Sequence, residues 1–289
     1  MDLSVVILTW NEEQNLPRCL ESVERLGCPV YIVDSGSTDG TCAIAARYGA
    51  SVVEHAFRTH SEQWDWAMRN LPLETRWVLG LDSDQSLTPE LIAELRQLFS
   101  KPVPEEIEGY YVTRRQIFRG QWIKHGGYYP KRLLKMFRRD KVFFDSNDLL
   151  DHHFYVPGRT AILKHDLIED NRKEQDLGFW MHKHIRYADL VAREEFRRIS
   201  DAVEPLKPSL FGSPDQRGLA LRAGWRKLPL YIRPALYFCY RYFARFGWID
   251  GKQGFLFHFL HAFWFRVLVD ANLDEILNSA GGAMPRTGD

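Results

Sequence analysis

Two aspartates separated by one serine form the most chemically suggestive group in this sequence. Asp82-Ser83-Asp84 directly follows 77–81, an apolar run typical of a buried strand. In an extended chain, residues two apart point to the same side, so the two carboxylates would repel each other without a compensating cation. Carboxylate oxygens of this kind suit magnesium or manganese, shared with a diphosphate. The alternative is a turn that caps the helix following it.

Polar residues also follow two earlier apolar runs. The stretch 9–12 ends the run 3–9, and a polar turn over 34–41 ends the run 30–33. Strands that alternate with helices in this way predict an α/β fold with a parallel sheet and right-handed crossovers. Ligands of such sheets bind outside the carboxyl ends of the strands. We therefore expect the three polar clusters to converge on one site.

Each side chain of these clusters has a functional and a structural interpretation. Asp34 could accept a hydrogen bond from the imide N–H of a pyrimidine base, or it could be satisfied by the backbone N–H groups of Ser37 and Thr38. Trp10 could stack on a base or belong to the core. No glycine-rich phosphate loop follows any strand, which argues against hydride transfer and ATP hydrolysis. A diphosphate bound without such a loop needs a metal.

These stretches resemble glycosyltransferase family 2. The resemblance rests on residues 5–13, 33–41 and 81–84, whose order and spacing match as well as their types, and it covers roughly 3–100. It implies a GT-A fold, in which a mostly parallel, Rossmann-like nucleotide-binding sheet carries helices on both faces. It also implies a nucleotide-sugar donor, most often UDP-linked, a divalent metal (Mg²⁺ or Mn²⁺) and inversion at the anomeric carbon.

The resemblance further implies which residues hold the donor. The donor-binding residues would be Thr9, Trp10, Glu12, Asp34, Asp82, Ser83 and Asp84. The residues at the ends of the first two strands would line the nucleoside pocket. Asp82 would face the ribose and the metal, and Asp84 would be the metal ligand.

The middle of the chain is similar to bacterial envelope-polysaccharide and lipopolysaccharide-core transferases. The similar stretches are 120–138, 150–154 and 183–187. In those relatives the positions matching 151–153 tend to read Asp-Glu-His, whereas this chain has a histidine in place of the glutamate. The resemblance implies an envelope glycan, or a lipid-linked precursor of one, as the acceptor.

An inverting transferase needs one general base to remove the proton of the acceptor hydroxyl. Asp151 is the candidate, with Glu169 and Asp170 as fallback positions. The alternative for Asp151 is a structural carboxylate paired with His152 or another neighbouring basic group. Six histidines lie between 125 and 184, but no His-Glu-x-x-His spacing occurs, so zinc is not expected.

Lys135 and Arg138 belong to a basic cluster on the expected acceptor side. They could contact a phosphorylated acceptor, or they could form an ordinary solvated face.

The composition of the chain bears on its binding partners and on its cellular compartment. The chain has 289 residues with 38 basic and 38 acidic side chains, and this neutral balance gives no indication of nucleic-acid binding. Four scattered cysteines fit a reducing cytoplasm. No basic leader with a cleavage site and no uncharged apolar run of about 18 residues is found, so we expect neither a signal peptide nor a simple membrane-spanning helix.

The C-terminal part differs in composition from the rest. Fifteen aromatic residues lie between Trp225 and Phe265, and the stretch 206–248 holds eight basic residues against one acid. Large aromatics and arginines are typical of helices that lie in a membrane interface, where anionic lipid attracts positive charge. The alternative is a helical hairpin packed on the catalytic domain or on a second copy of the chain.

The sequence thus predicts a GT-A domain over 1–204, with a nucleotide-sugar half (1–100) and an acceptor half (101–204), and a helical extension over 205–289. The predicted activity is inverting, metal-dependent glycosyl transfer onto a lipid-linked or envelope glycan, at the cytoplasmic face of the inner membrane. Two alternatives remain open at this point. One is a non-catalytic membrane scaffold with a degenerate transferase domain, and the other is a sugar-nucleotide pyrophosphorylase.

Overall fold

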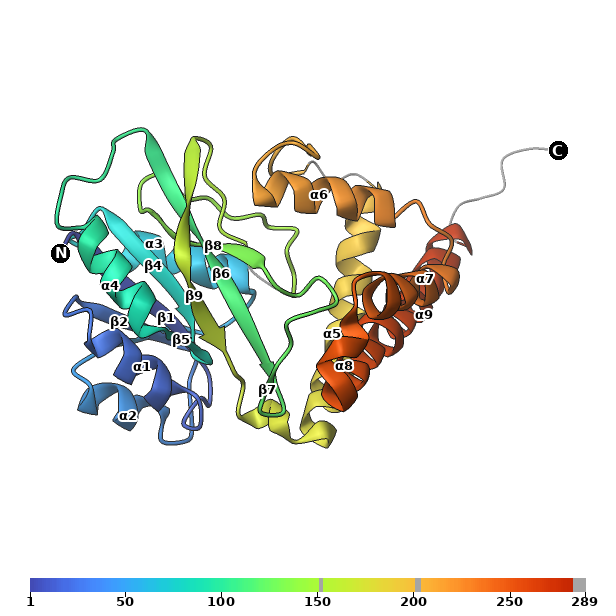
Figure 1. The fold of residues 1–289 in the computed structure, drawn as a ribbon, viewed down its shortest axis with the longest axis horizontal. Coiled ribbons are helices and arrows are strands. Elements are labelled where there is room, and N and C mark those ends of the chain that lie inside the picture. The colour runs from blue at the N-terminus through green and yellow to red at the C-terminus, as the bar shows by residue number, and fades with distance from the viewer. Residues whose placement is uncertain (151–152, 201–203, 283–289) are drawn as a thin grey trace. The chain divides into compact units, whose positions relative to one another are not determined.

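The chain divides into two compact units, seen in a computed structural model (Figure 1). The structure describes residues 1–150, 153–200 and 204–282. The first unit consists of residues 1–124, 128–146 and 151–175, and the second of 125–127, 147–150 and 176–289.

A nine-stranded sheet in the order β3-β2-β1-β4-β8-β6-β9-β5, with β7 paired to β6, forms the framework of the first unit. Strand β1 (Leu3–Thr9) lies between β2 (Val30–Asp34) and β4 (Trp77–Asp82) and is parallel to both. Strand β3 (Ser51–Glu54) is parallel to β2 on the far side. The register pairs Thr9 with Asp34 and Leu8 with Asp82, so the polar ends of these strands share one edge.

The second half of the sheet is mainly antiparallel. Strand β8 (Lys131–Arg138) is antiparallel to β4 and to β6 (Ile107–Phe118), while β9 (Arg159–Glu169) is parallel to β6. Two short strands, β5 (Gln85–Leu87) and β7 (Gln121–Trp122), pair antiparallel with β9 and β6. The sheet is therefore mixed: the strands up to Asp82 pair in parallel, and beyond them β6 and β9 form the one further parallel pair among the described strands.

Helices cover both faces of the parallel half, as predicted. One face carries α1 (Leu16–Glu24), α2 (Thr41–Arg47) and α4 (Pro89–Leu98), and the other carries α3 (His60–Asn70). Val5 and Ile7 of β1 lie in the first core and Val6 in the second, because successive strand side chains point to opposite faces. Burial on both faces explains why β1 is apolar without alternation.

The second unit is helical. Its elements are α5 (Leu177–Ser200), α6 (Pro214–Trp225), α7 (Ile232–Cys239), η2 (Tyr240–Ala244), η3 (Gly247–Asp250), α8 (Gly251–His258), η4 (Phe259–Trp264) and α9 (Phe265–Gly282), and η1 (Lys173–Gln175) ends the first unit. Helix α5 buries Ala188 and Ala192 against Phe265, Val269 and Leu273 of α9. This packing places α5 with the C-terminal helices, so the division falls at 175/176 and not at the predicted 204/205.

A buried ionic group joins three of these helices. Arg233 of α7 donates to Asp270 of α9 at 2.7 Å and to Glu195 of α5 at 2.8 Å, and both Arg233 and Asp270 are almost fully buried. A buried charge that lost its partner would be strongly destabilising, so this group fixes how α7 packs on α5 and α9.

The helical segments from Gly247 to Ser279 form a run of 33 residues that is long and apolar enough to cross a membrane, by length and composition. The best 18-residue window has a mean hydropathy of 1.2, and 44% of it is buried. No uncharged run of about 18 residues marks this helix in the sequence, because charged residues such as Asp250 and Arg266 interrupt it.

Candidate active site

Asp34, at the end of β2, is buried and accepts four hydrogen bonds. Its Oδ1 accepts from the Thr9 hydroxyl at 2.7 Å and from the Ser37 hydroxyl at 2.6 Å. Its Oδ2 accepts from the backbone N–H groups of Gly36 at 3.0 Å and Ser37 at 2.7 Å. Burial acts to raise the pKa of Asp34, but the bonds from Ser37, Thr9 and Gly36 outweigh it and leave the pKa below its usual value. A base N–H would have to compete with these donors.

The loop that follows β1 is bonded to the turn that follows β2. Asn11 takes a left-handed conformation (φ 53°) that asparagine tolerates well, and its backbone N–H donates to the Ser37 hydroxyl at 2.8 Å. The N–H of Glu12 donates to the Thr41 hydroxyl at 2.7 Å. Trp10 is 58% exposed, so it is not a core aromatic.

The two aspartates that follow β4 have different partners. The ammonium of Lys135 lies 2.8 Å from Oδ2 of Asp82, and the Lys135 side chain is only 4% exposed. Asn171 donates its side-chain N–H to Oδ2 of Asp84 at 3.1 Å. Ser83, between them, is buried. A lysine on β8 therefore neutralises one carboxylate of the pair.

A short segment, residues 170–173, connects the end of β4 to the loop after β1. The backbone N–H of Asp170 donates to the carbonyl of Asp84 at 3.1 Å. The ammonium of Lys173 lies 2.6 Å from Oε1 of Glu12 and 3.2 Å from the carbonyl oxygen of Asn11. These contacts join the segment after β4 to the loop after β1, which is itself bonded to the turn after β2.

Comparison with known proteins identifies the family. The profile of Glycosyl transferase family 2 matches residues 4–169, which is more than half of the chain.

The chain belongs to glycosyltransferase family 2.

Two curated relatives are named glycosyltransferases, in agreement with this assignment. The lipopolysaccharide core biosynthesis glycosyltransferase LpsC of Rhizobium meliloti is 28% identical over 261 residues, which cover 89% of this chain and 86% of LpsC. An uncharacterized glycosyltransferase of Rickettsia conorii is 34% identical over 110 residues, 38% of each chain. Among solved structures, S. aureus TarS 1–349 in complex with UDP covers 100% of this chain at a TM-score of 0.47 and 16% identity, with 94% of that chain covered.

The chain is therefore a glycosyltransferase, as the resemblance implied. The helix-bearing α/β sheet agrees with the predicted GT-A class, with the correction that its second half is mainly antiparallel. Membership in family 2 favours an enzyme over the scaffold and a transferase over the pyrophosphorylase.

The fallback bases of this family 2 enzyme already hold ionic partners. Glu169 accepts from Arg114 at 2.8 Å and from the Gln85 side chain at 2.8 Å. Asp170 is ion-paired with Arg18 of α1. Both carboxylates therefore serve a structural purpose at this edge. The first candidate base, Asp151, and its neighbour His152 lie outside the described residues.

Arg138 does not lie at this edge of the sheet. Because β8 is antiparallel to β4, Arg138 pairs with Trp77 at the start of β4, whereas Lys135 reaches Asp82 at its end. Arg138 donates to Glu105 at 2.5 Å and to the carbonyl oxygen of Ile107 at 3.2 Å. Of the two basic residues predicted for the acceptor side, the structure brings only Lys135 to the site.

Four residues that sequence reasoning did not single out complete the site, and these are Asn15, Arg18, Asn171 and Lys173. Asn15 donates to Glu12 at 2.8 Å and to Asn171 at 3.2 Å. Arg18 donates to the carbonyl oxygen of Asp84 at 3.0 Å. The only signal for Asn171 and Lys173 is their closeness in sequence to Glu169 and Asp170, because their partners lie 87 to 162 residues earlier in the chain.

Replacing Lys135 with methionine tests the neutralisation of Asp82. The change leaves a carboxylate without its buried cation, so we expect the free energy of unfolding to fall by about 1–3 kcal/mol in metal-free buffer. Saturating Mn²⁺ should raise the melting temperature of Lys135→Met more than that of the wild type, since the metal supplies the missing charge. Urea and thermal unfolding measure both effects.

The matched control is Lys141→Met, which removes an exposed lysine of the same unit. Equal stability of Lys135→Met, Lys141→Met and the wild type would show that the Asp82–Lys135 pair contributes nothing.

Proposed function

We propose that this family 2 enzyme is an inverting, divalent-metal-dependent transferase that moves a sugar from a nucleotide diphosphate donor to a lipid-linked or envelope glycan. The donor nucleotide is UDP. The enzyme works at the cytoplasmic face of the inner membrane as a peripheral protein.

One observation carries the proposal: three neighbouring parallel strands bring their polar ends to one edge. Thr9 and Asp34 are hydrogen-bonded across β1 and β2, and Asp82 ends β4 on the other side of β1. A nucleoside bound near the first two and a diphosphate near the third would span this edge, the usual ligand position in such sheets. Uridine as the base follows from the resemblance of residues 5–13, 33–41 and 81–84 to family 2, whose donors are most often UDP-linked.

The acidic strand end fits a magnesium or manganese ion. These ions are bound through one or two carboxylates together with substrate phosphates and water. Asp84, with Asp82 beside it, would hold the ion; in the described part of the chain, no group of three or more His, Cys, Asp or Glu gathers that could form an all-protein metal cage. When bound, the ion neutralises negative charge on the departing diphosphate.

Side chains of the protein orient the donor and remove the proton of the acceptor hydroxyl. Lys135 places a buried cation beside Asp82, from where its ammonium could donate to a diphosphate oxygen. Asp151 takes the proton of the acceptor hydroxyl, whose oxygen then bonds to the anomeric carbon on the face opposite the diphosphate. The bond from that carbon to the diphosphate breaks, which inverts the configuration.

The acceptor and location are inferred from the relative and from composition. LpsC is named for lipopolysaccharide core biosynthesis, and it matches most of this chain. The aromatic and basic C-terminal stretch supports attachment to a membrane surface.

Asp84→Asn tests the metal position. The change removes one negative charge where metal and diphosphate meet, so we expect a loss of roughly 10²-fold or more in donor turnover. Hydrolysis of UDP- and GDP-sugars with Mn²⁺ measures this without knowledge of the acceptor. Asp140→Asn, an exposed aspartate of the same unit, is the control and should retain full activity. Wild-type turnover of Asp84→Asn at saturating Mn²⁺ would refute the assignment.

Asp151→Asn tests the base. Only proton removal is affected, so UDP affinity should stay unchanged while kcat for transfer falls roughly 10²–10⁴-fold. Full transfer activity would move the role to Glu169 or Asp170. Glu169→Gln serves as comparison, because the loss of its ion pair with Arg114 should lower stability as well as activity.

A further inference from the structure

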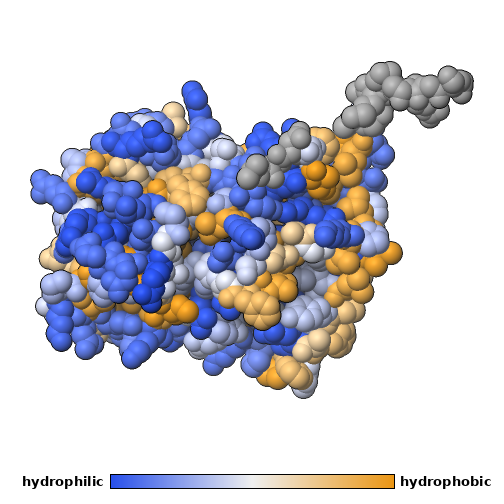
Figure 2. Space-filling model, turned by 90° about the horizontal axis from the view of Figure 1, so that it is seen from above, coloured by the Kyte–Doolittle hydropathy of each residue, from blue (hydrophilic) through white to orange (hydrophobic). Residues whose placement is uncertain are grey.

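Exposed hydrophobic side chains are concentrated in one stretch of the second unit. In the described part of the chain, thirteen exposed large hydrophobic residues lie between Leu210 and Phe255, and nine lie elsewhere. Figure 2 shows hydrophobic surface along the edge formed by α7 and α9. A contiguous apolar surface of this kind marks an interaction site more often than a scattered set does.

The helix formed by α7 and η2 carries an apolar stripe on its solvent side. Ile232, Leu236, Tyr240 and Phe243 are 56%, 53%, 50% and 59% exposed and follow one another at spacings of four, four and three residues. That spacing keeps them on one face of a helix. The turn that follows adds Phe246, Trp248 and Ile249, each more than half exposed.

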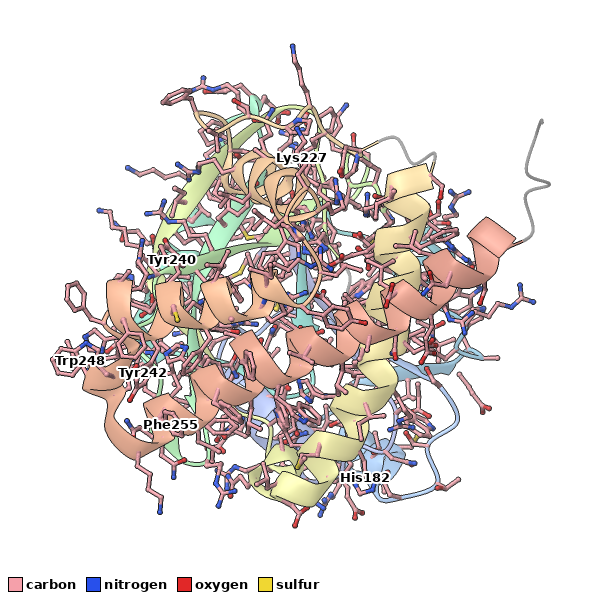
Figure 3. The ribbon with its side chains drawn as sticks, turned by 90° about the vertical axis from the view of Figure 1, so that its right-hand side faces the viewer. His182, Lys227, Tyr240, Tyr242, Trp248 and Phe255 are labelled. Carbon is pink, nitrogen blue, oxygen red and sulfur yellow. The ribbon has the colours of Figure 1, made fainter. Side chains whose placement is uncertain are left out.

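We call Leu236, Tyr240, Phe243, Phe246, Trp248 and Ile249 the hairpin patch. The name refers to the helical hairpin in which α7 and η2 pack against η4 and α8. Figure 3 shows Tyr240 and Trp248 toward the end of this hairpin where η2 leads into α8. Ile232 and Phe255 flank the patch, and both are exposed.

Other side chains of the same helix are already held by packing and hydrogen bonds. The helix therefore cannot turn about its axis to bury the patch. Arg233 is held in the buried group with Asp270 and Glu195. Tyr242 packs against Phe255 at a ring distance of 5.6 Å. Arg241 donates to the carbonyl oxygen of Gly126 at 2.7 Å, which ties the helix end to another segment of this unit. The patch is therefore a fixed outer surface.

The exposed charges of the chain stretch that carries the patch are positive, whereas the acids Asp274 and Glu275 lie on α9. Between residues 205 and 252 the exposed charged side chains are Lys207, Arg217, Lys227, Arg245 and Lys252. Asp250, next to the patch, is buried and accepts from the backbone N–H of His125 at 2.8 Å, with the His125 ring nitrogen Nδ1 at 2.7 Å. An apolar surface on a basic stretch of chain complements an anionic lipid surface.

The kinds of side chain and the length of the stripe also favour lipid. Tyrosine and tryptophan, with an apolar ring and a polar group, are enriched where a membrane meets water. From Ile232 to Phe243 the stripe is about 17 Å long, well short of the ~30 Å hydrocarbon core, so the helix would lie in the interface. A symmetric contact between two copies would instead bring the two basic stretches together.

We propose that the hairpin patch inserts into the interfacial region of an anionic bilayer and is the surface that holds the enzyme on the membrane. This proposal rests on the peripheral location proposed above and names the residues responsible for it.

Vesicle flotation of the full chain tests the patch. The patch variant is Tyr240→Ser/Phe243→Ser/Trp248→Ser, and the control Phe57→Ser/Phe179→Ser/Ile185→Ser removes three exposed apolar side chains elsewhere. With vesicles of phosphatidylcholine and phosphatidylglycerol, we expect the patch variant to bind at least tenfold more weakly and the control to bind like the wild type. Circular dichroism and unchanged donor hydrolysis would establish that the patch variant is folded.

A second variant tests the charge. Lys227→Gln/Lys252→Gln should weaken binding to the anionic vesicles by roughly fivefold per lysine, and added salt should reduce wild-type binding in the same direction. Binding to pure phosphatidylcholine should not change in this variant.

The possible outcomes distinguish three proposals: that the patch binds lipid, that the enzyme is held on the membrane, and that it transfers a sugar. If the wild type and the patch variant float equally well, the membrane location is supported, but the hairpin patch is not the surface that binds the membrane. If the wild type does not float with anionic vesicles, both are wrong, while donor hydrolysis still reports on the transferase. If sedimentation without lipid finds a dimer that the patch variant dissociates, the patch is a contact between two copies.

Discussion

Carboxylates that gather at one edge of a sheet repel one another unless each is neutralised, and this requirement shapes the site. Asp34 is compensated by hydroxyl and N–H donors, Asp82 by the buried ammonium of Lys135, and Glu12 by Lys173. The compensating groups come from different parts of the chain, so the need to neutralise these carboxylates also determines how those parts pack at this edge. Strand β8 must run antiparallel to β4 to deliver Lys135, and the 170–173 segment must follow β9 to deliver Lys173.

The same compensation prepares the edge for a donor. A donor would bring a negatively charged diphosphate and a positively charged metal ion to this edge. Lys135 could pair with the diphosphate, and Asp82 could pair with the ion. Asp34 has another use, because four donors hold it in the turn that orders Ser37 and, through it, Asn11. Its depressed pKa means that its contribution to stability is present above the ordinary pKa of an aspartate and is lost as the pH falls through the lowered value.

Local patterns were enough to predict the parallel half, since apolar runs ending in polar clusters correctly gave β1, β2 and β4. Long-range pairing was not predictable in this way. Arg138 and Lys135 are three residues apart, about 10 Å along a strand, and only the register of β8 shows which of them reaches Asp82. Helix α5 was assigned to the catalytic domain because its packing partner, α9, begins 65 residues after α5 ends. Lys173 was missed for the same reason.

The most direct measurement is calorimetric titration of UDP into the full chain, with Mn²⁺ and again after chelation with EDTA. If a cation at Asp84 joins the diphosphate to this acidic edge, UDP should bind with Mn²⁺ and at least tenfold more weakly without it, because an uncompensated diphosphate would face Asp82 and Asp84. Equal affinity in the two buffers, or no binding in either, would contradict the proposed donor site.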